Sequence, residues 1–248
     1  MTTGIPNFDS VGKPEAGKLS LRQFLTYENP NISHYQELIQ REYSASEGLR
    51  LNDSFSDLWA PVFFNREETD DTRRFQPDSR YKKALPYLVE KLQGEVLIDL
   101  GGARNIVIPS LAKKCGVLRC IDVDVMSEGE IPIGPNFDPF TGRRQMYPDV
   151  GFLTEEELRK QMEWIIVKAD MLNFIARLPS SSVNFSINGI DSNIIKTREY
   201  GDALMAEIKR TTKVGGVVFG IGSVFLPWGE GWNTNTVQAP GKIIEKIT

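Results

Sequence analysis

The chain has 248 residues, of which 40% are hydrophobic and 25% charged, with a formal net charge of −4. This composition is typical of a soluble globular protein, and the length suits one large α/β domain with an extension. The slightly acidic balance disfavours nonspecific binding to nucleic acids or anionic membranes, which attract basic surfaces. No apolar run reaches membrane-spanning length, so we expect no membrane partner.

The cysteine and histidine content predicts neither a disulfide nor a metal site. Cys115 and Cys120, the two cysteines, fall at a predicted helix end and in the next strand, where reduced thiols of a cytoplasmic protein are expected. One histidine and no cysteine pair at ligand spacing disfavour zinc.

Residues 1–80 are predicted to form an N-terminal extension or lid. It starts as a loosely packed arm with a short helical turn at 19–25. Ser33 followed by Gln36 predicts a capping box that begins a helix. The strongly aromatic segment 55–64 comes next, and we expect it to contribute to a cover over a ligand.

Residues 81–248 are predicted to form one α/β domain. Apolar runs of strand length alternate with segments of helical periodicity from Val96 to Ile221. This alternation predicts a doubly wound, mostly parallel Rossmann-like sheet over residues 85–225. One helix places Pro86 in its first turn, and a helix after Thr197 would use that residue as its cap.

The first strand ends in a turn suited to a nucleotide-like ligand. Val96–Leu100 contains Asp99, and Gly101 and Gly102 follow before a helix that begins near Asn105. Glycine allows a ligand to approach the backbone at such a turn, although double glycines also occur in ordinary strand-to-helix connections.

The second strand carries an acid at a characteristic distance from that turn. Asp122 lies 21 residues after Gly101, which is the spacing at which a carboxylate accepts hydrogen bonds from ribose hydroxyls. The alternative is that Asp122 only ends a strand. We expect Asp124 to end the strand in solvent.

Two further blocks complete a pattern. Residues 164–171 form a predicted strand that ends in Ala169-Asp170, and residues 183–191 are followed by a helix and by the strand that begins after Lys213-Val214-Gly215-Gly216. In order and spacing, the four blocks resemble class I S-adenosylmethionine-dependent methyltransferases. The resemblance implies a methyltransferase fold, S-adenosylmethionine as cofactor, and a position for Asp170 beside the adenine amine.

The resemblance also implies a set of site residues. The predicted cofactor-binding residues lie at strand ends and in the glycine turn: Asp99, Gly101, Gly102, Ala103, Asn105, Asp122, Val123, Asp170, Met171 and Asn188. Ala103 and Asn105 stand where the family has glycines. The family's signature for methylation of amino groups is absent after the fourth strand, and Asp191 is the one candidate general base, with helix capping as its alternative role.

Two regions depart from a minimal sheet. Residues 127–163 form a long insertion whose first part is rich in proline and whose end is a short helix capped by Thr154. It is predicted to cover the cofactor, or alternatively to decorate the surface. After the fifth strand the sequence leaves room for a loop at 226–235 and one strand at 242–247, which predicts either an abbreviated sheet or a chain that is a fragment.

Three functional hypotheses follow. The leading one is a methyltransferase that acts on a small-molecule acceptor. The second is a catalytically inactive methyltransferase-like domain that scaffolds or regulates a protein partner. The third, a dinucleotide-dependent enzyme, is disfavoured because no Gly-x-Gly-x-x-Gly follows the first strand.

Overall fold

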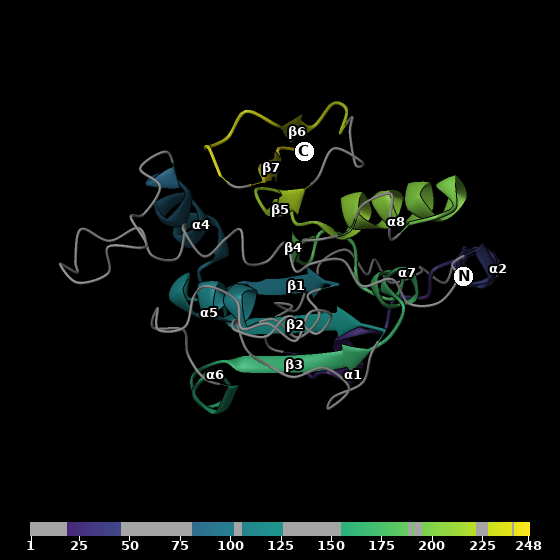
Figure 1. Ribbon diagram of the computed structural model, residues 1–248, viewed down its shortest axis with the longest axis horizontal. Coiled ribbons are helices and arrows are strands. Elements are labelled where there is room, and N and C mark those ends of the chain that lie inside the picture. The colour runs from purple at the N-terminus through teal and green to yellow at the C-terminus, as the bar shows by residue number, and fades with distance from the viewer. Residues whose placement is uncertain are drawn as a thin grey trace, which may run out of the picture.

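The computed structural model describes residues 19–45, 81–101, 106–125, 155–187, 190, 195–221, 228–239 and 241–248. Within this part of the chain one seven-stranded sheet has the order β3-β2-β1-β4-β5-β7-β6 (Figure 1). The strands are β1 (Val96–Leu100), β2 (Arg119–Asp124), β3 (Glu163–Lys168), β4 (Asn184–Ser186), β5 (Val217–Ile221), β6 (Trp232–Asn233) and β7 (Lys242–Lys246).

The pairing of the strands confirms a mostly parallel sheet. β1 pairs in parallel with β2 and β4, β2 with β3, and β4 with β5. β7 runs antiparallel to both β5 and β6. All five residues of β1 are buried, as expected for a central strand covered on both faces.

Helices cover both faces of the sheet, which confirms the doubly wound arrangement. They are α1 (Leu21–Phe24), α2 (Ile32–Ala45), α4 (Ala84–Leu92), α5 (Val107–Lys114), α6 (Glu155–Gln161), α7 (Met171–Ile175) and α8 (Arg198–Thr211). Residues of α1, α2, α7 and α8 share one hydrophobic core with alternate strand residues such as Ile98 and Leu100. Residues of α4, α5 and α6 share the other core with Leu97. No helix in the described residues is long and apolar enough to span a bilayer.

The short helical turn predicted at 19–25 is confirmed as α1, and this segment is packed on the core instead of forming a loose arm. The side chain of Ser20 accepts a hydrogen bond from the backbone of Gln23, and Gln23 reaches back to Ser20, so this pair forms the capping box of α1. Phe24 of α1 is fully buried in the core. α2 begins at Ile32, so the capping box predicted at Ser33 is wrong, because Ser33 already lies inside the helix.

A buried polar centre holds this segment against α8. Glu207 accepts hydrogen bonds from Tyr35 Oη (2.9 Å) and Asn29 Nδ2 (3.1 Å). Arg210 completes the centre with Nη2 2.6 Å from Glu207 Oε2, and its guanidinium stacks on Tyr27 with 4.2 Å to the ring centroid. Because a buried carboxylate requires several donors, Glu207 fixes how α2 sits on α8.

The C-terminal end of the sheet differs from the prediction. The strand expected at 242–247 is confirmed as β7, but the short strand β6 was not expected. Together they close the sheet with antiparallel pairing, so it is not abbreviated. Of the insertion at 127–163, the structure describes the end and confirms its helix as α6, whereas Thr154 lies outside the described residues.

Candidate functional site

The strand order reverses at β1, beside the described members of the predicted site. The chain proceeds outward from β1 through β2 to β3, and then returns to the opposite side of β1 to form β4. In open parallel sheets, ligands bind beside the carboxyl ends of the strands at such a reversal. Asp99, Gly101, Asp122 and Asp170 are all found at these ends.

The turn after β1 has a backbone conformation that requires glycine. Gly101 is exposed and has a φ of +67°, in the left-handed region that disfavours other residues. Its N–H donates to the carbonyl of Val123 at 3.0 Å, which ties the turn to β2. Gly102, Ala103 and Asn105 lie outside the described residues.

Asp99 and Asp122 are register partners on adjacent strands, and both side chains are 0% exposed. Burial is the main cause that raises the pKa of Asp99 to about 7. The Ser186 hydroxyl, on the neighbouring β4 register position, opposes this rise, and the charge of Asp124 adds to it. The Ser186 contact favours the ionised carboxylate, although its geometry falls short of a hydrogen bond to either Asp99 oxygen.

Cys120 lies beside the same pair of carboxyl groups. Burial raises the pKa of its thiol well above the usual value, and the charges of Asp99 and Asp122 raise it further. The thiol therefore stays protonated at neutral pH and is a poor nucleophile. Cys115 is also buried and free.

Asp124 is not the solvent-exposed strand end that the sequence suggested. It is 5% exposed, and its carbonyl accepts a hydrogen bond from the N–H of Ala169 at 2.8 Å. Its register partner on β3 is Lys168. Asp124 therefore belongs to the same group of acids as Asp99 and Asp122.

Asp170 caps a helix. Its Oδ1 accepts from the backbone N–H of Asn173 at 3.0 Å at the start of α7, and its Oδ2 accepts from the hydroxyl of Tyr200 at 2.9 Å. Burial raises the pKa of Asp170, and these hydrogen bonds counteract the rise. Because each carboxylate oxygen has a second lone pair, capping leaves Asp170 able to accept from a ligand.

The other predicted residues divide into three groups. Val123 is fully buried in the core, and Met171 packs against that core as the first residue of α7. Asn188 and Asp191 lie outside the described residues, as do the aromatic segment 55–64 and most of the insertion. Trp228, in the loop predicted at 226–235, belongs to the core.

Sequence reasoning missed Glu42, which joins α2 to the loop before α8. Its carboxylate accepts from the backbone N–H groups of Lys196 (2.5 Å) and Thr197 (2.7 Å), and from the Thr197 hydroxyl (2.6 Å). Thr197 is the N-cap of α8, but its side chain makes no capping hydrogen bond. Glu42 therefore brings a negative charge from another helix to this helix start, in addition to that of Glu199 in the first turn of α8.

Tyr43, the next residue, was also missed. Burial raises the pKa of its hydroxyl to about 12, and the charges of Asp170, Asp124 and Glu42 contribute in that order. The neighbouring Glu42 accepts hydrogen bonds from Thr197, which is three residues before Tyr200, the donor to Asp170 after β3. Figure 1 shows α7 beside the arrowheads of β2 and β3, and α2 farther out on the same side, beyond α7.

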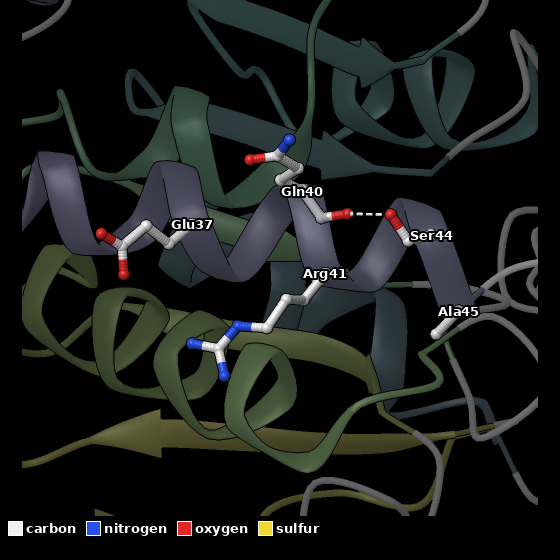
Figure 2. A pocket seen from close by; sticks show the side chains of 5 residues that line it. All are labelled: Glu37, Gln40, Arg41, Ser44 and Ala45. Atoms are coloured by element: carbon white, nitrogen blue, oxygen red, sulfur yellow. Dashed lines mark hydrogen bonds between the residues drawn. The ribbon is translucent and has the colours of Figure 1, made fainter.

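A hollow on the surface is lined by residues of α2 other than Glu42 and Tyr43. It has a volume of about 590 Å³, and its described lining residues are Glu37, Gln40, Arg41, Ser44 and Ala45 (Figure 2). The Ser44 hydroxyl donates to the Gln40 carbonyl at 2.8 Å, so this contact stays within the helix. None of these residues belongs to the acid group at the strand ends, which separates the hollow from the candidate site.

Comparisons with known proteins identify no family. No protein-family model matches the chain, and no curated protein matches its sequence. Among solved structures, the S-adenosylmethionine-dependent methyltransferase SibL in its apo form is similar to this chain at 14% identity and a TM-score of 0.35. The match covers 88% of this chain and 70% of SibL.

Proposed function

We propose that the protein binds S-adenosylmethionine at the carboxyl ends of β1 and β2 and transfers its methyl group to a small-molecule acceptor. One observation carries the proposal. The glycine turn at Gly101 and the acid pair Asp99–Asp122 lie side by side at the reversal of a parallel sheet. A nucleoside ligand requires this combination of an open backbone turn and a hydroxyl acceptor.

The charge of the site supports S-adenosylmethionine over a dinucleotide. Four acids, Asp99, Asp122, Asp124 and Asp170, end or directly follow the first three strands. S-adenosylmethionine carries a sulfonium and an ammonium group, whereas a dinucleotide carries a diphosphate that carboxylates repel. Besides burial, the charge of Asp124 raises the pKa of Asp99 and the charge of Glu42 raises the pKa of Asp170, and a cationic ligand would relieve this repulsion.

The residues present fit the cofactor in a defined order. Gly101 would take the methionine part on its exposed backbone, Asp122 would accept from the ribose hydroxyls, and Asp170 would lie toward the base. When bound, the cofactor supplies an electrophilic methyl group. The protein then needs to align the acceptor and exclude water. Asp191 remains the candidate general base, and the insertion at 127–163 remains the candidate cover.

The burial of the acid pair favours one alternative. Asp99 and Asp122 have no exposed surface, so a ligand reaches their oxygens only after neighbouring groups move aside. A methyltransferase-like domain that has lost its cofactor could keep such a closed pair and serve as a scaffold or regulator for a protein partner. Ala103 and Asn105, which replace two family glycines, support the same alternative.

Calorimetric titration of the full chain with S-adenosylmethionine, S-adenosylhomocysteine and NAD tests the proposal. We expect both sulfur-containing ligands to bind and NAD to give no heat of binding. Methyl transfer is then tested by incubating the protein with labelled S-adenosylmethionine and pools of small-molecule acceptors. Absence of binding by either sulfur-containing ligand would refute the proposed function, and binding without transfer to any acceptor would favour the scaffold alternative.

A further inference from the structure

The last turn of α2 is held to the segment directly before α8. Glu42 is buried, and its three hydrogen bonds hold this turn to Lys196 and Thr197, directly before α8. Tyr43 is the adjacent residue, so its backbone position is set by the same contacts. An aromatic side chain on an anchored turn loses little entropy when it contacts a ligand.

A chain of hydrogen bonds links the turn that carries Tyr43 to Asp170. Glu42 accepts from Thr197, and Tyr200, three residues further along the chain, donates to Asp170. In agreement with this arrangement, the charges of Asp170 and Asp124 add to the effect of burial in raising the pKa of Tyr43. Tyr43 is nevertheless 46% exposed, which leaves part of the side chain open for contact.

The strand order indicates which part of a bound ligand would lie near Tyr43. β2 lies between β1 and β3, so Gly101, Asp122 and Asp170 follow one another across the sheet edge. If the methionine part rests on the turn at Gly101 and the ribose on Asp122, the base extends toward β3. The hydrogen bonds from Thr197 to Glu42 and from Tyr200 to Asp170 put the turn that carries Tyr43 on the β3 side of this path.

We infer that Tyr43 forms the outer wall of the ligand site at the ends of β2 and β3 and contacts the base of the bound nucleoside. This inference rests on the proposed function. Aromatic rings stack on nucleobases in many proteins, and removal of such a ring weakens binding by about 1–3 kcal/mol. A residue at the base end contributes equally to ligands that share the nucleoside, whatever group they carry at the 5′ position.

Three variants of the full chain test the inference. Tyr43→Ala removes the ring, Tyr43→Phe keeps the ring without the hydroxyl, and Arg41→Ala changes an exposed residue of the same helix that lines the separate hollow (Figure 2). The probes are adenosine and S-adenosylhomocysteine, measured by calorimetry, with competition for the weaker one. The unfolding midpoint of each variant confirms that it is folded.

We expect Tyr43→Ala to weaken both probes by about tenfold and by the same factor. Tyr43→Phe should retain most of the affinity, and Arg41→Ala all of it. Unchanged affinity in Tyr43→Ala would overturn the inference and leave the proposed function standing. Weaker S-adenosylhomocysteine with unchanged adenosine would also overturn it, because Tyr43 would then act at the methionine end. If the wild-type protein binds neither probe, the proposed function fails, and the inference fails with it.

Discussion

The two ends of the parallel strands differ in how their charged residues are arranged. We call the side of the sheet where these strands begin the amino edge, and the side where they end the carboxyl edge. At the amino edge, opposite charges are paired: Glu95 precedes β1 and contacts Lys213 Nζ at 2.5 Å, and Arg119 of β2 contacts Glu163 of β3 at 2.8 Å. At the carboxyl edge, acids gather, and burial raises the pKa of both Asp99 and Asp170. The amino edge is arranged for stability.

The carboxyl edge has a cost in stability. A buried carboxyl with a raised pKa is less stable in its ionised form than in water, so the fold gains nothing from its charge. Such groups are concentrated at functional sites, where a ligand or a reaction uses them. The contrast therefore indicates that the carboxyl edge holds the functional site and that the amino edge stabilises the fold. The following substitutions test this difference.

The largest effect on stability is expected at the amino edge. Asn184 is fully buried; its Oδ1 accepts from the N–H of Val217 at 2.8 Å, and its Nδ2 contacts the Val96 carbonyl at 3.4 Å. Asn184→Ala leaves the Val217 N–H without this acceptor. We expect a loss of about 2 kcal/mol in the free energy of unfolding, measured by denaturant titration. A loss below about 0.5 kcal/mol would show that this edge is less tightly organised than its contacts indicate.

At the carboxyl edge, we expect a substitution to raise the free energy of unfolding instead of lowering it. The folded protein holds the Asp99 proton up to a pH of about 7, whereas an unfolded aspartate releases it near its ordinary pKa of 3.8. Stability from this group is therefore complete at pH below the unfolded pKa and is lost as the pH rises toward 7. Asp99→Asn does not titrate, and its amide can donate to the neighbouring carboxyl of Asp122.

At pH 8 we expect Asp99→Asn to be more stable than the wild type by about 1 kcal/mol or more, since one pKa unit corresponds to about 1.4 kcal/mol. The advantage should shrink at pH 5. Thermal unfolding at the two pH values measures it. If Asp99→Asn is less stable than the wild type by the same amount at both pH values, the Asp99 carboxylate stabilises the fold. This result would contradict the contrast between the two edges.

The smallest effect is expected for the partly exposed ion pair of the amino edge. The side chain of Lys213 is 45% exposed and that of Glu95 27% exposed. Solvent screens such a pair, so Lys213→Ala should lower the free energy of unfolding by about 0.5 kcal/mol or less, and less still in high salt. A loss above about 1 kcal/mol would indicate that this pair organises the whole edge.

Much of the fold could be predicted from the sequence because its signals are local. The central strands are short apolar runs, and the helices between them have an apolar face. Glycines and prolines mark the helix ends: Pro86 lies in the first turn of α4, and Gly116 follows α5. β6 has two residues and no such run, so it could not be found. Ser20 and Ser33 both begin a Ser-x-x-Gln pattern, and the sequence does not show that Ser20 forms the capping box.

The site was harder to predict because its contacts span the chain. The turn at Gly101 and the neighbouring positions of Asp99 and Asp122 follow from strand pattern and spacing. Glu42 reaches partners 154 and 155 residues away, and nothing in its own helix distinguishes it from an exposed glutamate. Asp124 is buried because separate elements enclose it. The roles predicted for Gly102, Ala103, Asn105, Asn188 and Asp191 stay predictions.

The affinity of Asp122→Ala for S-adenosylmethionine tests the central claim, that the carboxyl edge binds the cofactor. The substitution removes the acceptor for two ribose hydroxyls. Asp202→Ala, which changes an exposed acid on α8, is the matched control. Unfolding midpoints show whether both variants are folded. We predict that Asp122→Ala weakens binding by roughly 1–3 kcal/mol, while Asp202→Ala binds like the wild type. Equal affinity in all three proteins would show that Asp122 is only the end of a strand and would contradict the account.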